Sequence, residues 1–114
     1  VSALQHDPES INVIKKSKCF IILMHMQGNP QTMQKNPKYN FAPKDIYFFL
    51  KKQIIKCEKN NIKKNRIIID PGIGFGKTSK HNIQILQNLK IFHNQFFWKR
   101  FAKTLRWTNS IFFY

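Results

Sequence analysis

Apolar residues form two short continuous runs, and between and beside these runs they recur at helical spacing. Residues 66–69 make up one run, with three β-branched isoleucines, and residues 19–26 make up the other. Continuous apolar runs of this length predict strands that are buried on both faces. The resulting order of helix, strand, helix, strand and helix is typical of an α/β protein with a parallel sheet.

The helix between the two runs has the most regular pattern. Pro43 opens it, apolar side chains recur at intervals of three and four residues with lysines opposite, and Asn60 and Asn61 end it. Its predicted buried stripe consists of Ile46, Phe49, Leu50, Ile54 and Cys57.

The two outer helices are predicted from the residues at their first turns. Asp7 as N-cap and Pro8 as first helical residue indicate an N-terminal helix, and Thr78 or Ser79 is expected to cap the last one. Residues 1–4, before the first of these helices, are predicted to be the stub of a strand or the loop after one. The expected buried residues are Ile11, Val13 and Ile14 in the first helix, and Ile83, Ile85, Leu86 and Leu89 in the last.

The loop after the second run carries the candidate chemistry. Asp70 ends the strand, Pro71 bars further strand pairing, and three glycines follow at alternate positions, from residue 72 to residue 76. A carboxylate is costly to bury unless it has a partner. At the carboxyl end of a parallel strand it faces the ligand crevice and can accept two parallel hydrogen bonds from adjacent N–H donors. The alternative is that Asp70 caps a turn or a helix.

Two nucleotide-binding motifs look like this loop but fail on spacing. A phosphate P-loop that ended in Gly76-Lys77-Thr78 would need glycine at position 71, which is proline. The G-x-G-x-x-G motif fails because the three glycines alternate with single residues.

The first apolar run ends in Met24, His25 and Met26. Side chains alternate along a strand, so the two methionines share one face and His25 takes the other. A methionine at this place can line a pocket for a flat heteroaromatic ring, or it can belong to the core. The four histidines show no metal-ligand spacing, and we assign neither metal ligands nor catalytic residues.

Composition bounds the class of protein. The 114 residues are one domain at most, or a piece of one, with twenty Lys and Arg against five Asp and Glu. Such a balance can indicate a nucleic-acid partner or an anionic surface. The basic residues are nearly all lysines, however, and they are scattered and accompanied by an excess of Ile and Asn. This pattern favours the codon bias of an AT-rich genome over a nucleic-acid partner.

Cysteine content and hydropathy bear on the compartment. Cys19 and Cys57 are too far apart for a zinc motif or a disulfide framework, so we expect small apolar residues in a reducing cytosol. No run approaches the roughly 20 apolar residues of a membrane span, and no secretory signal is visible. The expectation is a cytoplasmic protein that is not bound to a membrane.

Two stretches resemble the central motifs of a known family. Residues 22–30 (Ile-Leu-Met-His-Met-Gln-Gly-Asn-Pro), followed by Thr-Met-Gln at 32–34, are the first, and residues 70–77 (Asp-Pro-Gly-Ile-Gly-Phe-Gly-Lys) are the second. In order and spacing they are similar to dihydropteroate synthase, as are His81 and Asn82 after them. The resemblance covers about residues 1–94, which we interpret as a partial pterin-binding domain.

The family folds as a (β/α)8 TIM barrel. It condenses 6-hydroxymethyl-7,8-dihydropterin diphosphate with 4-aminobenzoate in folate biosynthesis, releasing diphosphate with Mg²⁺. The resemblance therefore implies a partial barrel, about strands five and six with flanking helices. It implies that Asp70 holds the amino-pyrimidine edge of the pterin, that Met24 and Phe75 line the pocket, and that Gly74 lets the loop approach it. A homodimer is possible for the full-length enzyme.

The departures from the family define the expected limits of the chain. Three features of the family have no counterpart here: its Asn-Asp pair, its magnesium-binding Asn and its Ser-Arg-Lys-Ser strand. Residues 95–114 instead form an unmatched basic aromatic tail, which we interpret as a frameshifted or non-native end. We expect a fragment that is poorly folded and inactive alone. The alternatives are a related pterin-binding methyltransferase barrel, or a small basic protein that binds nucleic acid through the tail.

Overall fold

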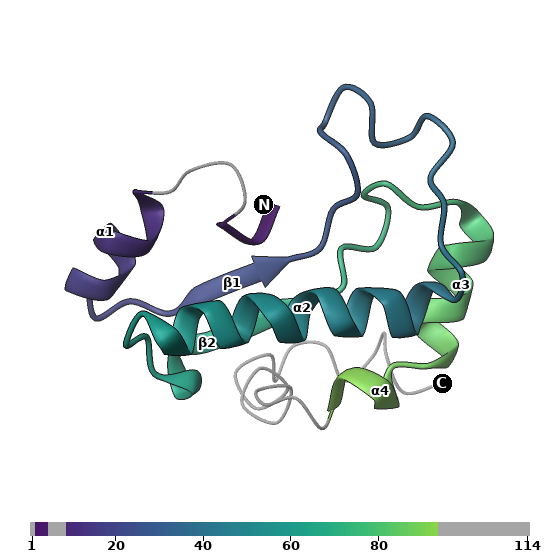
Figure 1. Ribbon diagram of the computed structural model, residues 1–114. Helices are drawn as coiled ribbons and strands as arrows, with labels where there is room; N and C mark the ends of the chain where they lie inside the picture. Colours follow the sequence, from purple (N-terminus) through teal and green to yellow (C-terminus); the bar gives the residue numbers. More distant parts are fainter. Residues whose placement is uncertain (1, 5–8, 94–114) are drawn as a thin grey trace, which may run out of the picture.

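A two-stranded parallel sheet with one long helix across it forms the centre of the computed structural model, which describes residues 2–4 and 9–93 (Figure 1). The order of helix, strand, helix, strand and helix and the parallel sheet are as predicted. The elements are η1 (Ser2–Leu4), α1 (Ser10–Lys16), β1 (Ile21–Met24), α2 (Ala42–Lys59), η2 (Lys64–Arg66), β2 (Ile67–Asp70), α3 (Ser79–Gln87) and α4 (Lys90–His93).

The register of the two strands sets which side chains share a face. Ile21 pairs with Ile67, and Met24 at the end of β1 pairs with Asp70 at the end of β2. The His25 N–H donates to the Asp70 carbonyl at 2.9 Å, which continues the pairing by one residue. Met24 and Asp70 therefore lie side by side at the carboxyl end of the sheet.

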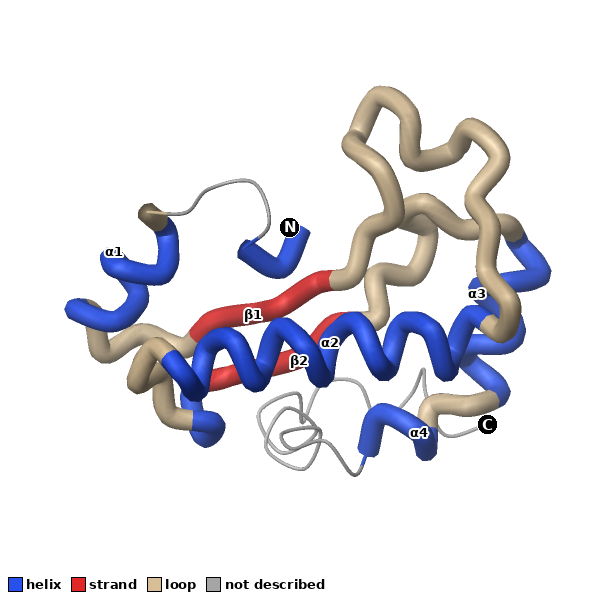
Figure 2. Tube along the Cα trace, in the orientation of Figure 1, coloured by secondary structure: helices blue, strands red, loops and turns tan. Residues whose placement is uncertain are grey.

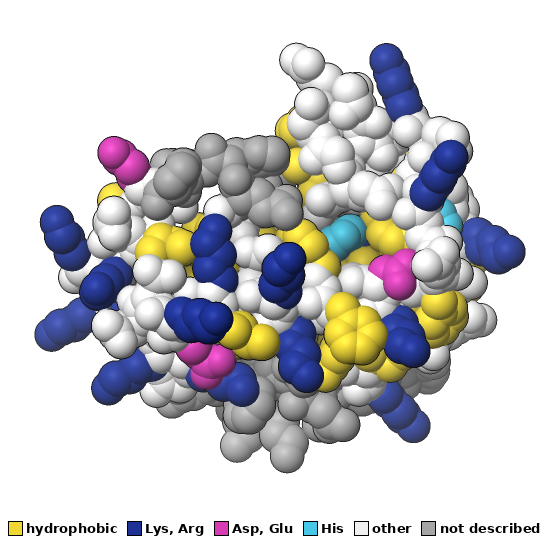
Figure 3. Space-filling model, in the orientation of Figure 1, with side chains coloured by type: hydrophobic (Ala, Val, Ile, Leu, Met, Phe, Trp, Pro, Cys, Tyr) yellow, Lys and Arg dark blue, Asp and Glu magenta, His cyan; other side chains and the backbone are white. Residues whose placement is uncertain are grey.

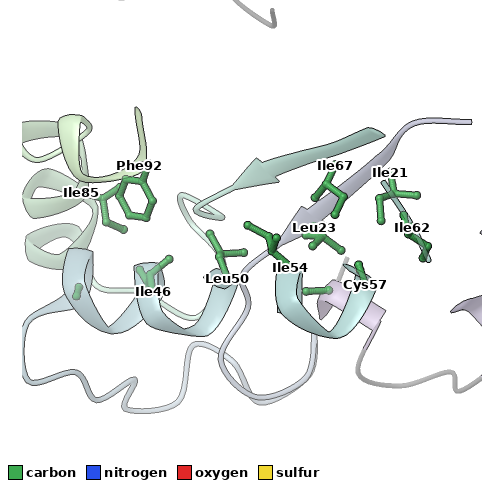
Figure 4. Packing of buried hydrophobic residues seen from close by; sticks show 12 residues of the cluster. Ile21, Leu23, Ile46, Leu50, Ile54, Cys57, Ile62, Ile67, Ile85 and Phe92 are labelled. Carbon is green, nitrogen blue, oxygen red and sulfur yellow. The ribbon is translucent and has the colours of Figure 1, made fainter. Parts of the chain in front are cut away.

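Helix α2 covers one face of the sheet. Its stripe was predicted correctly, because Ile46, Leu50, Ile54 and Cys57 are buried and Phe49 is half-buried. These side chains pack over buried residues of both strands, and Figure 4 shows the contacts along the helix. The helix ends at Lys59, with Asn60 as C-cap, as its sequence indicated.

The other face of the sheet is more open, so the prediction that both strands are buried on both faces is wrong for these residues. Ile22 in β1 is 57% exposed, and Ile68 in β2 is half-buried. Strand β1 is also shorter than the predicted run, since Cys19 and Phe20 are exposed and precede it. The apolar run measures the hydrophobic character of the strand, whereas burial depends on which elements are present to cover it.

Several details of the outer helices also differ from expectation. In α3 the buried residue is Ile85, whereas Ile83 and Leu86 are exposed, because the helix turns a different face toward α2. Val13 in α1 is exposed, while Ile11 is buried. Residues Ser2–Leu4 form a 3-10 turn, so the strand alternative for them is wrong.

Some predictions fall on residues outside the described ranges. Asp7 and Pro8 are among them, and the described part of the first helix begins at Ser10 after Glu9 as N-cap. The tail at 95–114 also lies outside the described residues. Across 2–4 and 9–93, none of the helices combines the length and the apolar character that crossing a bilayer requires.

Candidate functional site

Two loops meet at the carboxyl end of the sheet. The chain leaves β1 into a long loop over residues 25–41 and leaves β2 into the glycine loop over residues 71–78 (Figure 2). Both loops rise from the same edge because the strands are parallel, and this edge is where α/β proteins bind ligands. The candidate site is the surface that these two loops and the strand ends share.

Asp70 stands at the centre of this edge as the last residue of β2. Its side chain is half-buried, and its Oδ1 accepts a hydrogen bond of 2.7 Å from the Gly72 N–H. The described residues thus form the turn contact that was the alternative interpretation of Asp70. This contact uses one oxygen of the carboxylate, so the turn also orients the group.

A hollow of about 320 Å³ lies beside β2 and next to this carboxylate. Its lining is mainly apolar and includes Asp70 and the partly exposed Phe75, so the structure brings these two predicted residues together. Met24 is buried next to Asp70 in the register but is not part of the lining. Gly74 also lies outside the hollow, with open space where a Cβ would stand.

The glycine loop is held by side chains from elsewhere in the chain. The Tyr39 hydroxyl donates to the Gly76 carbonyl at 2.7 Å, and Gln34 Nε2 donates to the Gly74 carbonyl. From the other side, Asn82 Oδ1 in α3 accepts from the Gly74 N–H at 3.0 Å. The glycine loop is therefore held by the long loop on one side and by α3 on the other.

Helix α3 starts directly after this loop, and its first turn is capped. Thr78 Oγ1 accepts from the His81 N–H at 3.3 Å, and His81 Nδ1 accepts from the Thr78 N–H at 3.2 Å. This reciprocal capping box confirms Thr78 as the cap. The ring of His81 also contacts Tyr39 edge-on, with centroids 4.8 Å apart, which joins the cap to the long loop.

Close approach explains why the loop needs glycine at position 72. The residue has a φ of +67°, and a Cβ there would stand 1.9 Å from the His25 carbonyl oxygen. Any side chain would therefore collide with the backbone at the end of β1.

Lys77 is buried under the loop, next to His25. Its ammonium contacts the backbone carbonyls of Gly72 and Phe75 and the Nδ1 atom of His25, at 2.7, 2.8 and 3.0 Å. Burial lowers the pKa of Lys77 to about 8, although the nearby Asp70 carboxylate opposes this shift. Burial, and then the charge of Lys77, lower the pKa of His25 to about 4, so His25 is neutral at pH 7.

Around α2, the described surface shows no concentrated group of charged side chains that would indicate a second site. Figure 3 shows Lys and Arg side chains spread across this face of the molecule, without a concentrated patch. Within residues 2–4 and 9–93, no three His, Cys, Asp or Glu side chains are grouped so that they could hold a metal ion.

A family model gives these features a context. The model described as "Pterin binding enzyme" matches residues 1–103 of this chain. The chain belongs to the pterin-binding enzyme family. Both of the loops described above fall within the residues matched to the family.

Curated members of the family agree. The chain is 44% identical to dihydropteroate synthase of Haemophilus influenzae over 92 residues, which are 81% of this chain and 33% of that protein. It is 42% identical to the Escherichia coli dihydropteroate synthase over 90 residues, 77% of this chain and 31% of that one. The chain thus spans about a third of the length of these relatives.

Solved structures of the family are also similar. A Yersinia pestis dihydropteroate synthase with a sulfonamide drug complex superposes with a TM-score of 0.79 at 38% identity, over 83% of this chain and 34% of that one. A Xanthomonas albilineans dihydropteroate synthase in complex with 7,8-dihydropteroate has a TM-score of 0.71 at 30% identity, over 82% and 34%. The described fold is therefore one that complete enzymes of the family contain.

Four residues that hold the loop were not predicted as site residues: Gln34, Tyr39, Lys77 and Asn82. Gln34, Lys77 and Asn82 appeared only in the stretches that resemble the family, apart from the use of Lys77 to test for a P-loop. A possible signal for Lys77 was its place in an apolar and glycine-rich context, because a lysine there must find acceptors. No local pattern indicated the contacts of Gln34 and Tyr39, since each is about 40 residues from its partner, although Gln34 stands in the stretch that resembles the family.

Proposed function

We propose that this chain provides the pterin-binding part of a dihydropteroate synthase. The observation that carries the proposal is Asp70, oriented at the carboxyl end of β2 within a family whose solved members include a complex with 7,8-dihydropteroate. The whole enzyme would condense 6-hydroxymethyl-7,8-dihydropterin diphosphate with 4-aminobenzoate. The names of the curated relatives favour this activity over that of a pterin-binding methyltransferase.

In the proposed (β/α)8 barrel, β1 and β2 are about the fifth and sixth strands. Helix α2 takes the position of an outer helix, and the open face with Ile22 and Ile68 faces the barrel interior. This assignment is supported by the exposure of Ile22, which has the hydrophobic character of a buried strand residue but no cover in the described chain. It is also supported by the position of Asp70, since barrel enzymes carry their sites at the carboxyl ends of the strands.

Within the site, the predicted residues take distinct roles. The Asp70 carboxylate accepts hydrogen bonds from the amino-pyrimidine edge of the pterin, Phe75 contacts the ring from the hollow, and Met24 supports the pocket beside Asp70. Gly74 keeps the loop free of a side chain where the ligand approaches. A carboxylate that accepts two parallel N–H donors gives both affinity and orientation.

The proposed reaction indicates what the pterin-binding residues of this chain must do. The amine nitrogen of 4-aminobenzoate forms a bond to the methylene carbon of the pterin, the bond from that carbon to the diphosphate oxygen breaks, and the amine loses a proton. The residues of this chain hold the pterin ring, so that its methylene group is kept in one place during the displacement.

Other properties of the whole enzyme stay predictions. Mg²⁺ would stabilise charge on the departing diphosphate, but the described residues contain no cluster of ligands for it, and we derive no step through it. A cytoplasmic location and a homodimer are proposed from the family resemblance. The domain boundary near residue 94 stays a prediction from the sequence, and the match to the family model extends to residue 103.

A chimaeric enzyme tests the proposal. In it, residues 1–93 of this chain replace the matching segment of the Escherichia coli dihydropteroate synthase. We expect the chimaera to release diphosphate with 4-aminobenzoate and to bind the pterin diphosphate by calorimetry. Asp70→Asn should weaken pterin binding about 30- to 150-fold, because the amide cannot accept both donors of a charge-assisted pair.

The control is Glu58→Gln, which removes a carboxylate from the exposed side of α2. This variant should bind pterin as the unsubstituted chimaera does. A folded chimaera that neither binds the pterin nor turns it over would disprove the proposal. Equal affinities for Asp70→Asn and Glu58→Gln would leave the fold assignment standing but remove the role of Asp70.

A further inference from the structure

The glycine loop encloses a lysine ammonium, which is an unusual group to bury. Lys77 is 3% exposed, and the other lysines within residues 9–93 are exposed or half-buried. A charged group in such a place is unfavourable unless hydrogen-bond acceptors replace the water it has lost.

The acceptors around Lys77 match what an ammonium needs. Its Nζ lies 2.7 Å from the Gly72 carbonyl oxygen, 2.8 Å from that of Phe75 and 3.0 Å from His25 Nδ1. These three contacts fit the three N–H donors of the group, and the His25 carbonyl oxygen is a fourth, longer neighbour at 3.3 Å. Because Lys77 donates to Nδ1, the proton of the neutral His25 ring belongs on Nε2.

These acceptors come from two separate segments, so the ammonium joins them. Gly72 and Phe75 belong to the glycine loop, whereas His25 follows β1. The same Gly72 that accepts from Lys77 through its carbonyl donates through its N–H to Asp70 Oδ1, at 2.7 Å. The Gly72 carbonyl and N–H lie in the two peptide groups on either side of one Cα, so a displacement of Gly72 at its carbonyl would also disturb its hydrogen bond to the Asp70 carboxylate.

We propose that Lys77 is a positioning residue for pterin binding, because its ammonium holds the Gly72 turn that orients the Asp70 carboxylate. This inference rests on the proposed function and adds to it a residue that does not touch the ligand. A role in stability alone would instead lower the amount of folded enzyme, and so the apparent kcat, without raising KM for the pterin diphosphate over that for 4-aminobenzoate. The two roles therefore predict different kinetics.

The experiment is Lys77→Met in the chimaera, which keeps an apolar stem of similar length and removes the charge. Its matched control is Lys80→Met, three residues further on in α3, where the lysine is exposed. We expect Lys77→Met to raise KM for the pterin diphosphate about tenfold or more. KM for 4-aminobenzoate should stay within about twofold, as should both values in Lys80→Met.

A second variant covers the case in which Lys77→Met fails to fold. Lys77→Ala leaves space for a small cation among the same carbonyls, so ammonium chloride should lower KM for the pterin diphosphate, whereas tetramethylammonium chloride should not. Equal rises in both KM values, or ammonium that restores the melting temperature without lowering KM for the pterin, would overturn the inference. An inactive but folded chimaera with Lys77 intact would instead count against the proposed function.

Discussion

On one face of the sheet, Leu23 and Ile67 are almost inaccessible beneath α2, whereas on the other face their neighbour Ile22 is more than half exposed. Apart from Asp70, the strands carry apolar side chains on both faces, so the difference in burial comes from what packs against them. The covered face holds the continuous core of the described chain, which runs from η1 to α4. The open face carries Met24 and Asp70 at its carboxyl end.

This difference separates stability from ligand binding. The described chain is held together through α2, while the open face holds the hydrophobic surface that the proposed barrel would bury and the carboxylate proposed for the pterin. Gly72 and His25 lie at the boundary between the covered side and the open face, so they affect both stability and the proposed ligand site. Substitutions on either side of this boundary can test whether the separation is correct.

The largest effect is expected from Gly72→Ala in the chimaera. The added Cβ meets the His25 carbonyl oxygen at 1.9 Å, and we expect relief of this collision to strain the hydrogen bond from the His25 N–H to the Asp70 carbonyl. We expect urea unfolding to show a loss of more than about 4 kcal/mol, the range that indicates a specific defect.

Gly74→Ala is the matched control. Its φ of +84° is similarly unfavourable for alanine, but no atom lies within 4 Å of the added Cβ. Only the conformational cost of about 1–2 kcal/mol should appear. Equal losses in the free energy of unfolding for the two variants would show that the backbone relieves the collision at Gly72. The turn at Gly72 would then not be a rigid part of the structure.

The next effect compares neighbouring residues on opposite faces. Leu23→Ala removes a side chain packed under α2 and should lower the free energy of unfolding of the chimaera by about 2–5 kcal/mol. If Ile22 faces the interior of a complete barrel, Ile22→Ala should cost a comparable amount, measured in the same urea titrations. A loss below about 0.5 kcal/mol for Ile22→Ala would contradict the proposed barrel orientation.

The smallest effect is a pH dependence at the boundary. The pKa of His25 is lowered from 6.5 to about 4, chiefly by burial and then by Lys77. As the pH falls below 6.5 the unfolded state takes up a proton first, so this group's contribution to stability is lost between pH 6.5 and 4. The loss should be on the order of 2 kcal/mol in urea unfolding.

His25→Gln provides the reference for this measurement. The contributions of the carboxylates are common to both proteins and cancel in the difference between the two pH profiles. The variant should therefore lose less stability than the parent over the same interval. Parallel profiles would mean that His25 takes up its proton as readily in the folded protein as in the unfolded one.

The sequence predicted the covered side better than the open side. The stripe of α2 follows a period that depends on this helix alone, and it was correct from Ile46 to Cys57. The face of α3 was only partly correct: Ile85 is buried and Leu89 packs against the core, but Ile83 and Leu86 are exposed. The helix carries apolar residues on more than one side, and the sequence does not say which side packs against α2. Exposure of Ile22 could not be predicted, since the apolar run does not say how many strands accompany it.

The same limit applies to the site. Asp70 was predicted because a carboxylate at a strand end before a glycine loop is a local pattern, whereas Phe75 was implied only by the family resemblance. The structure places both at one hollow. The contacts of Lys77 with His25, and of Tyr39 with Gly76, join residues far apart in the chain. Such contacts follow from the parallel arrangement of the strands and leave no trace in the spacing of residue types.

A loop with three glycines in five residues would be expected to sample many conformations, and fixing each residue costs about 1–2 kcal/mol of conformational entropy. Here hydrogen bonds from Lys77, Tyr39, Gln34 and Asn82, all within the chain, hold that loop. Its ordering is thus part of the folding of the chain. A pterin that arrives at Asp70 would meet a preorganised surface, and its binding free energy would not be reduced by the entropy of closing the loop.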